Sequence, residues 1–178
     1  YALLFIDDVS QKKQISLALK KLSSQNTKII LLVPRRRTAL FLDILLDSKT
    51  LKHTYTVLTG DFFGLKFQAT ALSKIIREAF LNLTISVSPQ VIVPIFPISD
   101  TDFLNLISYI LFGNPKVHGV YKGYYSNPQT LLSLAHILQR HEPELSLDFS
   151  HSMHKKSNNG VQLLSDRAIK DRLGLAPE

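Results

Sequence analysis

Ala2-Leu3-Leu4-Phe5-Ile6-Asp7-Asp8-Val9 is the stretch that decides the predicted fold. An unbroken apolar run ahead of an amphipathic pattern indicates a strand buried on both faces, as in the middle of a parallel sheet. Ligands in such folds bind beyond the carboxyl ends of the strands, where Asp7 and Asp8 fall. Two adjacent carboxylates repel each other, so the pattern favours a cation beside them. The alternative is a helix cap made by Asp8 or Ser10.

The composition limits the class of protein. The chain has 178 residues, a net charge of +7 and no cysteine. This length fits one domain with an appendage. A cysteine-free sequence excludes disulfides, thiolate zinc sites and cysteine nucleophiles, and it fits a reducing compartment, so we expect a cytoplasmic protein without a membrane span. The basic charge favours an anionic partner, nucleic acid first, although solvated lysines and arginines on helix faces would give the same composition.

Strand and helix patterns alternate along the chain. Strands are predicted over 2–6, 28–33, 55–59, 91–96 and 116–121, and helices over 11–25, 40–46, 66–83, 100–112 and 127–140. Five strand-helix units in strict alternation predict an α/β fold, a doubly wound five-stranded parallel sheet with helices on both faces.

Charged residues follow three of the predicted strands. Asp7 and Asp8 follow the first strand, Asp61 the third and Lys122 the fifth. Convergence from separate strands is typical of a site in this kind of fold. Clustered carboxylates bind Mg²⁺, and a carboxylate beside Mg²⁺ can attack a phosphoryl group. The sequence therefore predicts Asp7, Asp8 and Asp61 as metal ligands, with Asp61 as the nucleophile and Lys122 as its cationic partner.

Several short segments, taken in order, resemble the CheY-like receiver domain of bacterial response regulators. They are Phe5 to Val9, the helix that follows it, Pro89 to Val93, Ser99 to Asp102, and Gly119 to Lys122. The resemblance covers residues 1 to about 141 and implies the sheet order 2-1-3-4-5. It also implies Mg²⁺ on Asp7 and Asp8, a phosphate-accepting Asp61 and a phosphate contact from Lys122.

The resemblance sets the expected function. It implies a cytoplasmic two-component, phosphorelay protein whose partner is a sensor kinase and whose own catalysis is at most aspartyl autophosphorylation. The sequence departs from the family around Asp61, which lies between Thr59-Gly60 and Phe62-Phe63-Gly64, and at Gly123, where proline is usual. Two alternatives stay open: a degenerate receiver for protein assembly or for an anionic second messenger, and a metal-dependent phosphoryl enzyme on another α/β fold.

The last part of the chain differs in composition. Residues 142–160 are polar and predict a linker between the receiver-like domain, 1–141, and a helical segment, 161–178. Leu164 to Glu178 is similar to the first helix and turn of the helix-turn-helix that follows LuxR/NarL-type receivers, with Gly174 as the turn glycine. That similarity implies DNA binding and transcription regulation. The alternative is a bare amphipathic helix that ends in a glycine cap.

Other motifs bear on ligands. Arg35-Arg36-Arg37 follows the second strand, where the arginines can bind an anion such as phosphate or lie in a solvated loop. The sequence contains no Gly-x-Gly-x-x-Gly, P-loop or Gly-x-Ser-x-Gly motif, which disfavours a dinucleotide oxidoreductase, an NTPase of that type and an α/β-hydrolase. Residues 103–112 are apolar almost all round, which predicts either core packing or a homodimer face.

Overall fold

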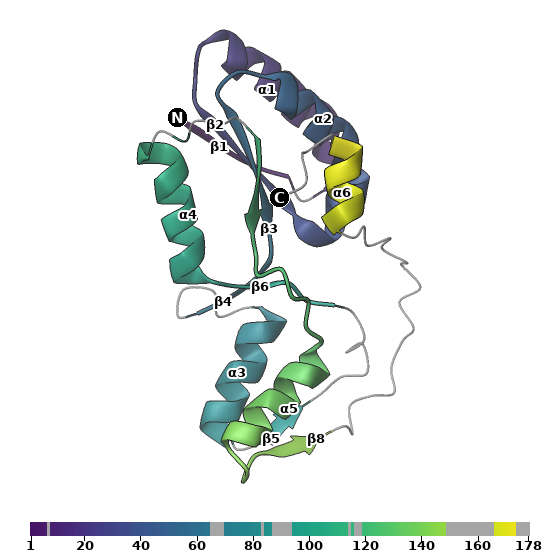
Figure 1. Ribbon diagram of the computed structural model, residues 1–178, viewed down its shortest axis with the longest axis vertical. Helices are drawn as coiled ribbons and strands as arrows, with labels where there is room; N and C mark the ends of the chain where they lie inside the picture. Colours follow the sequence, from purple (N-terminus) through teal and green to yellow (C-terminus); the bar gives the residue numbers. More distant parts are fainter. Residues whose placement is uncertain are drawn as a thin grey trace. The chain divides into compact units, whose positions relative to one another are not determined.

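The structure is a computed structural model that describes residues 1–6, 8–64, 70–82, 84–86, 94–113, 115, 119–148 and 166–173. Its strands are β1 (Ala2–Phe5), β2 (Ile29–Pro34), β3 (Thr54–Thr59), β4 (Asp61–Phe63), β5 (Thr84–Ser86), β6 (Pro97–Ser99), β7 (Gly119–Gly123) and β8 (Ser146–Asp148). Its α-helices are α1 (Lys12–Ser24), α2 (Leu42–Thr50), α3 (Ala71–Asn82), α4 (Asp100–Phe112), α5 (Leu131–His141) and α6 (Asp166–Leu173) (Figure 1). Short 3₁₀ helices cover Val9–Gln11 and Arg35–Phe41.

The chain divides into two compact units. The sheet unit comprises Tyr1–Thr59, Asn105–Gly123 and Gly160–Glu178, and the second unit comprises Gly60–Leu104 and Tyr124–Asn159. The predicted division into 1–141, 142–160 and 161–178 stays a prediction, and most of the linker lies outside the described residues.

The sheet unit is built on four parallel strands in the order β1-β2-β3-β7. The α/β class and the parallel sheet are therefore confirmed, whereas the order 2-1-3-4-5 is wrong because β1 lies at an edge of this sheet. The predicted fourth strand, 91–96, lies partly outside the described residues. Beyond it, β6 pairs with β4 in the second unit and does not join the four-stranded sheet.

Burial separates the strands by their place in the sheet. Every residue of β3 is buried, as are the first five residues of β2. In β1, by contrast, burial alternates, and the side chains of Leu3 and Phe5 are 62% and 51% exposed. The prediction that this strand is buried on both faces was wrong, because an apolar run does not distinguish an inner strand from an edge strand.

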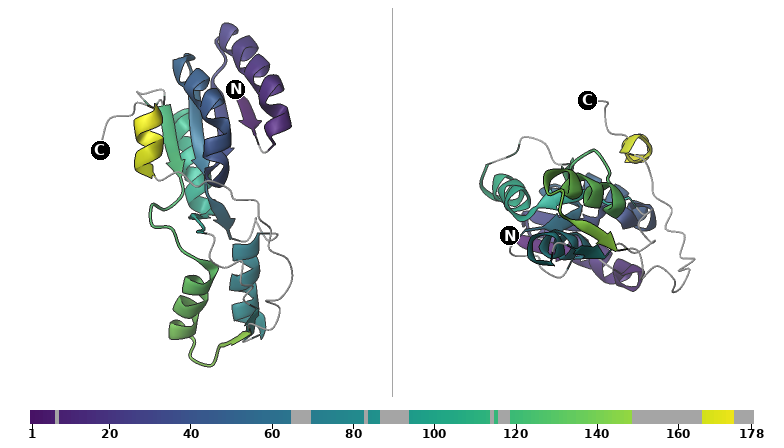
Figure 2. Two further views of the ribbon diagram at one scale, coloured as in Figure 1. Left: turned by 90° about the vertical axis from the view of Figure 1, so that its right-hand side faces the viewer. Right: turned by 90° about the horizontal axis from the view of Figure 1, so that it is seen from below.

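Helices cover both faces of the sheet, as predicted. The Ser48 hydroxyl of α2 hydrogen-bonds the Thr56 hydroxyl of β3 at 2.9 Å. Neighbouring strand residues point to opposite faces, so Val57 faces away from α2. A Cβ on Gly123 would lie 2.9 Å from Val57 and 3.7 Å from Leu106 of α4, which places α4 on that other face. Figure 2 shows α1 and α2 together on one side of the strands.

Lys28 fastens the end of α4 to the sheet. Its ammonium donates to the carbonyl oxygens of Ile110 and Leu111 at 2.9 and 3.1 Å, and it lies 5.4 Å from the centre of the Tyr55 ring. The last carbonyls of a helix carry a partial negative charge and have no partner within the helix, so a lysine there is stabilising.

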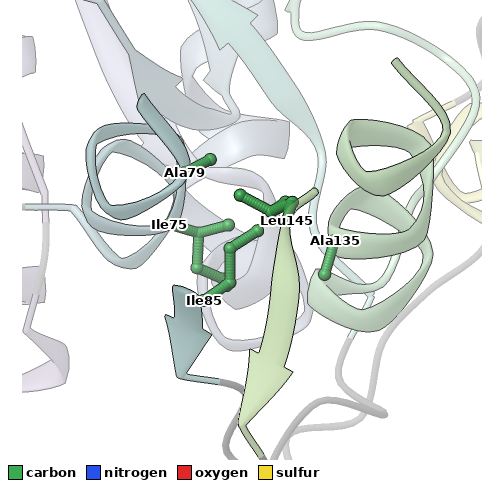
Figure 3. Packing of buried hydrophobic residues seen from close by; sticks show 5 residues of the cluster. All are labelled: Ile75, Ala79, Ile85, Ala135 and Leu145. Carbon is green, nitrogen blue, oxygen red and sulfur yellow. The ribbon is translucent and has the colours of Figure 1, made fainter. Parts of the chain in front are cut away.

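The second unit has a small core between α3 and α5. Ile75 and Ala79 of α3 pack with Ile85 of β5, Ala135 of α5 and Leu145 (Figure 3). Two parallel strand pairs, β4 with β6 and β5 with β8, accompany the helices. Within the described ranges, no helix has the length and apolar character needed to cross a bilayer.

Candidate functional site: the carboxyl edge of the sheet unit

Asp8 caps the helical segment that follows β1. Its carboxylate accepts a hydrogen bond from the Ser10 N–H at 2.8 Å, and the Gln11 side-chain oxygen accepts one from the Asp8 N–H at 3.3 Å. Hydrogen bonds from the Ser10 backbone and side chain lower the pKa of Asp8, and the charge of Arg37 lowers it further. The capping role, one of the two predicted for this residue, is confirmed, and its role as a metal ligand stays a prediction.

The arginines stand at the carboxyl end of β2. The 3₁₀ helix Arg35–Phe41 starts directly after Pro34, the last residue of that strand. Arg35 is buried, with 3% of its surface exposed, while Arg36 is partly exposed and Arg37 exposed. Because the charge of Arg37 lowers the pKa of Asp8, the residues that follow β1 and β2 lie close enough for their charges to interact.

Lys12 links the helices next to this edge. Its ammonium lies 3.1 Å from a carboxylate oxygen of Asp43 in the first turn of α2, and 5.8 Å from the centre of the Phe41 ring. This ion pair fixes the start of α1 against the start of α2. It is partly exposed, so its contribution is to geometry more than to stability.

The assignment of Asp7, Asp8 and Asp61 as metal ligands stays a prediction. Among the described residues, no group of three histidine, aspartate or glutamate side chains is suited to hold a metal ion. Asp7 lies outside those residues. Asp8 follows β1, and Lys122 belongs to β7 at the other edge of the sheet. Three strand spacings separate those edges, which is about 14 Å.

Asp61 belongs to the second unit, where it joins β4 to the segment before β6. Its carboxylate accepts a hydrogen bond from the Phe96 N–H at 2.8 Å, and its own N–H donates to the Phe96 carbonyl at 2.6 Å. This pair of bonds gives Asp61 a structural role in that unit. Its predicted catalytic role stays a prediction, as does that of Lys122.

A polar group at the start of α4 was not predicted from the sequence. The Asp102 carboxylate accepts hydrogen bonds from the Tyr125 hydroxyl and, at 2.7 Å, from the Ser99 hydroxyl, which in turn accepts one from the Asp102 N–H at 3.0 Å. The Tyr125 bond lowers the pKa of Asp102 and raises the pKa of Tyr125. Ser99-x-x-Asp102 is a helix-start pattern that marks the cap, but no sequence signal connects it to Tyr125.

This group predicts a pH dependence for the second unit. The lowered pKa of Asp102 gives stability that is lost as the pH falls through that pKa, and the raised pKa of Tyr125 gives stability that is lost as the pH rises through it. In Tyr125→Phe, we expect the second unit to lose less stability than the wild type both at low pH and at high pH. An ultraviolet titration of wild type against Tyr125→Phe is expected to reveal one tyrosine that ionises above the ordinary range. If the tyrosine whose titration disappears in Tyr125→Phe had an ordinary pKa, the prediction would be contradicted. Tyr109→Phe is the control.

The second unit also has two apolar hollows along α3. One of about 430 Å³ lies beside Phe80 and Leu81, and one of about 230 Å³ lies beside Leu134 and Leu138 of α5. Phe63 and Ile76 line both of them. Neither offers the charged groups that a phosphate ligand needs, apart from Arg77 at the larger one.

Comparison with known proteins identifies the fold. No family model and no curated protein matches the sequence. Among solved structures, the chain is similar to the NAD-dependent NDP-hexosamine 5,6-dehydratase of tunicamycin biosynthesis, with 10% identity, a TM-score of 0.62 and coverage of 97% of this chain and 70% of that chain. It is also similar to ADP-L-glycero-D-manno-heptose-6-epimerase from Helicobacter pylori, with 13% identity, a TM-score of 0.61 and coverage of 97% of this chain and 71% of that chain. A third similar structure is UDP-N-acetylglucosamine 4-epimerase from Bacillus cereus, with 12% identity, a TM-score of 0.56 and coverage of 98% of this chain and 78% of that chain.

These likenesses overturn the functional expectations. The three structures named above are a dehydratase and two epimerases of nucleotide-linked sugars, the first of them NAD-dependent, and none is a receiver domain, so the resemblance to response regulators was wrong. The two-component and DNA-binding functions, the sensor kinase and DNA as partners, Mg²⁺ as cofactor and both alternative functions are wrong for the same reason. The edge position of β1 agrees, because a receiver needs its first strand inside the sheet. The chain has a Rossmann-like α/β fold with a four-stranded parallel sheet.

Proposed function

We propose that this chain is the nucleotide-sugar-binding part of an NAD-dependent epimerase or dehydratase. The similar structures act on NDP-, ADP- and UDP-linked sugars, whose diphosphate is anionic. The observation that carries the proposal is the arginine segment Arg35–Arg37 at the carboxyl end of β2, where ligands of open α/β sheets bind.

The proposed contact is between the diphosphate and the two accessible arginines. A guanidinium presents a planar set of donors that matches two phosphate oxygens at once. Arg36 is partly exposed and Arg37 exposed, so both can reach a ligand at the edge. Asp8 beside Arg37 would repel a phosphate placed at the end of β1, which favours binding on the Arg36 side.

NAD does not fit the turns that follow β1 and β2. The pyrophosphate of a dinucleotide is bound by a glycine-rich turn and the first N–H groups of a helix. The turn after β1 contains Asp8, Val9 and Ser10, and the turn after β2 contains the arginines, so neither has a glycine. The Asp8 carboxylate already accepts the Ser10 N–H at 2.8 Å and carries the same charge as a pyrophosphate. We therefore propose no NAD site on these turns. The cytoplasm is the compartment that we propose, because a cysteine-free chain fits reducing conditions.

Calorimetric titration with UDP-N-acetylglucosamine tests the proposal. Arg36→Gln and Arg37→Gln are each expected to weaken binding about tenfold to a hundredfold, because a hydrogen bond to a charged group contributes about 1.5–3 kcal/mol. The matched control is Lys21→Gln, which removes the same charge and should leave the Kd unchanged. Lys21 lies in the last turn of α1, and so at the amino-terminal ends of the strands, away from the arginines.

Two outcomes would contradict the proposal. One is a wild-type chain that gives no binding heat with UDP-N-acetylglucosamine at millimolar concentration. The other is an affinity that changes equally in the Lys21→Gln control and in the two arginine variants, since that would indicate general charge attraction and no site. Uridine has no phosphate for the arginines to contact. Its affinity should therefore be the same for the wild type and for the two arginine variants.

A further inference from the structure

Helix α3 has an apolar stripe besides the one that packs in the core of the second unit. Ile75 and Ala79 face that core (Figure 3). Ile76 and Phe80, each one position further along the helix, line the hollow of about 430 Å³ instead. Residues four positions apart lie on one face of a helix, so Ile76 and Phe80 form one wall of this hollow. The core and the hollow therefore use different faces of the same helix.

The rim of this hollow is apolar and exposed. Phe80 is 73% exposed and Leu81 is 71% exposed. Large apolar side chains that stay exposed around a recess are typical of a surface that a ligand covers. A volume of about 430 Å³ lies within the range of small-molecule sites, which is about 300–1,000 Å³. The hollow therefore fits a small molecule with a large apolar part.

The charge at the hollow comes from Arg77. Among the described residues that line the hollow, this exposed arginine is the charged one. The Glu78 carboxylate, next to it in sequence, has other partners: the Lys74 ammonium at 3.5 Å and the Ser86 N–H at 3.4 Å. A guanidinium matches the two oxygens of one carboxylate through parallel hydrogen bonds. The hollow thus combines an apolar lining with a group that selects a carboxylate.

We propose that this hollow binds a fatty carboxylate, with the carboxylate on Arg77 and the alkyl chain in the hollow. The chain covers Phe80 and Leu81, and the apolar area that is removed from water stabilises the complex. The hollow belongs to the second unit, whereas Arg36 and Arg37 belong to the sheet unit. The proposal therefore goes beyond the nucleotide-sugar function and does not depend on it.

Two other head groups fit the hollow less well. A phosphate monoester carries about 1.5–2 negative charges at neutral pH, and a single arginine leaves part of that charge without a partner. An alkylammonium would be repelled by Arg77. The position of the carboxylate is also restricted, because the Asp100 carboxylate lies so close to Gly64 that a Cβ on this glycine would collide with it. Repulsion by Asp100 disfavours the Gly64 side of the hollow and leaves Arg77 as the contact.

Calorimetric titration of the full chain with decanoate, below the concentration at which micelles form, tests the proposal. We expect decanoate to bind more tightly than decan-1-ol, and the affinity to rise about fourfold for each methylene added from octanoate to decanoate. In methyl NMR spectra, decanoate is expected to shift the signals of Ile76 and Leu81. The signals of Leu3, an exposed leucine of the sheet unit, should not move.

Variants separate the two parts of the site. Arg77→Gln should weaken decanoate binding about tenfold, the lower end of what a hydrogen bond to a charged group contributes, and should leave decan-1-ol binding unchanged. Its matched control is Arg140→Gln, an exposed arginine in the last turn of α5 that does not line the hollow, which should change neither affinity. Phe80→Ala should weaken both ligands by a similar factor. Leu104→Ala, at an exposed apolar residue of the same unit, is the control for that variant.

Four results would overturn the proposal. They are a wild-type chain that gives no binding heat with decanoate, equal affinity of the wild type for decanoate and decan-1-ol, an equal loss of affinity in Arg77→Gln and Arg140→Gln, and shifted Leu3 signals without a shift at Ile76. A chain that binds no decanoate, sediments as a dimer and becomes a monomer in Phe80→Ala would identify a second copy as the occupant instead. Arg77→Gln should bind UDP-N-acetylglucosamine as the wild type does, so failure of the proposed function and failure of this inference can be told apart.

Discussion

Phe41→Ala is expected to lower the free energy of unfolding of the sheet unit by about 3–5 kcal/mol, the usual cost of removing a buried phenyl ring. Phe41 ends the 3₁₀ helix after β2 and has 0% of its surface exposed. The Lys12 ammonium, held by Asp43, lies against its ring. Loss of the ring would leave a cavity and also release this ion pair from the apolar surface it covers.

Urea denaturation followed by hydrogen exchange of the sheet-unit peptides measures this loss. Leu40→Ala is the matched control, because Leu40 is adjacent in sequence but 45% exposed, and it should cost about 1 kcal/mol or less. Phe41→Leu should restore most of the stability. A Phe41→Ala protein that unfolds at the same urea concentration as Leu40→Ala would contradict the core position of this ring.

Gly60→Ala is expected to destabilise the second unit by about 3 kcal/mol, at the upper end of overpacking costs. A Cβ at this position would lie 2.1 Å from the Phe96 carbonyl oxygen and 2.7 Å from the Tyr124 Cβ. The first of these atoms is backbone and already accepts the Asp61 N–H, so it cannot move without breaking that hydrogen bond. The bond from the Phe96 N–H to the Asp61 carboxylate would be disturbed as well.

Hydrogen exchange of peptides from the second unit reports the effect. Faster exchange is expected in β4 and around Phe96, while peptides of β1 and β2 keep their wild-type rates. The control is Glu144→Ala, an exposed position of the same unit that should change exchange little. Wild-type exchange around Phe96 in Gly60→Ala would mean that the close approach of these backbones is not needed.

The fold class could be predicted from the sequence because it follows from local patterns. The apolar runs that became β2 and β3, and the helical spacing of α1, were each sufficient to place a strand or a helix. Strand order is not local, and the same apolar run, Ala2–Phe5, reads alike at an edge or in the centre. The resemblance to receivers failed at this point, because it assigned to the first strand two neighbours where the described sheet has one.

The candidate site was harder to predict than the fold. A carboxylate after a strand has the same appearance in sequence whether it caps a helix or binds a metal. For Asp8, the hydrogen bond from the Ser10 N–H establishes the cap. Asp61 looked like the end of a strand but begins one, and it serves backbone groups 35 positions away. The bond between Tyr125 and Asp102 depends on tertiary contact across 23 positions, so no local pattern contains it.

The sheet unit is discontinuous in the chain, and this affects the order in which it can fold during synthesis. Tyr55 of β3 pairs with Gly119 of β7, and the first part of the second unit lies between them in the sequence. On the ribosome, β1, β2 and β3 therefore emerge well before the strand that completes them. Until β7 arrives, the edge of β3 with which it pairs stays bare, and an unpaired apolar strand edge is prone to aggregation during folding.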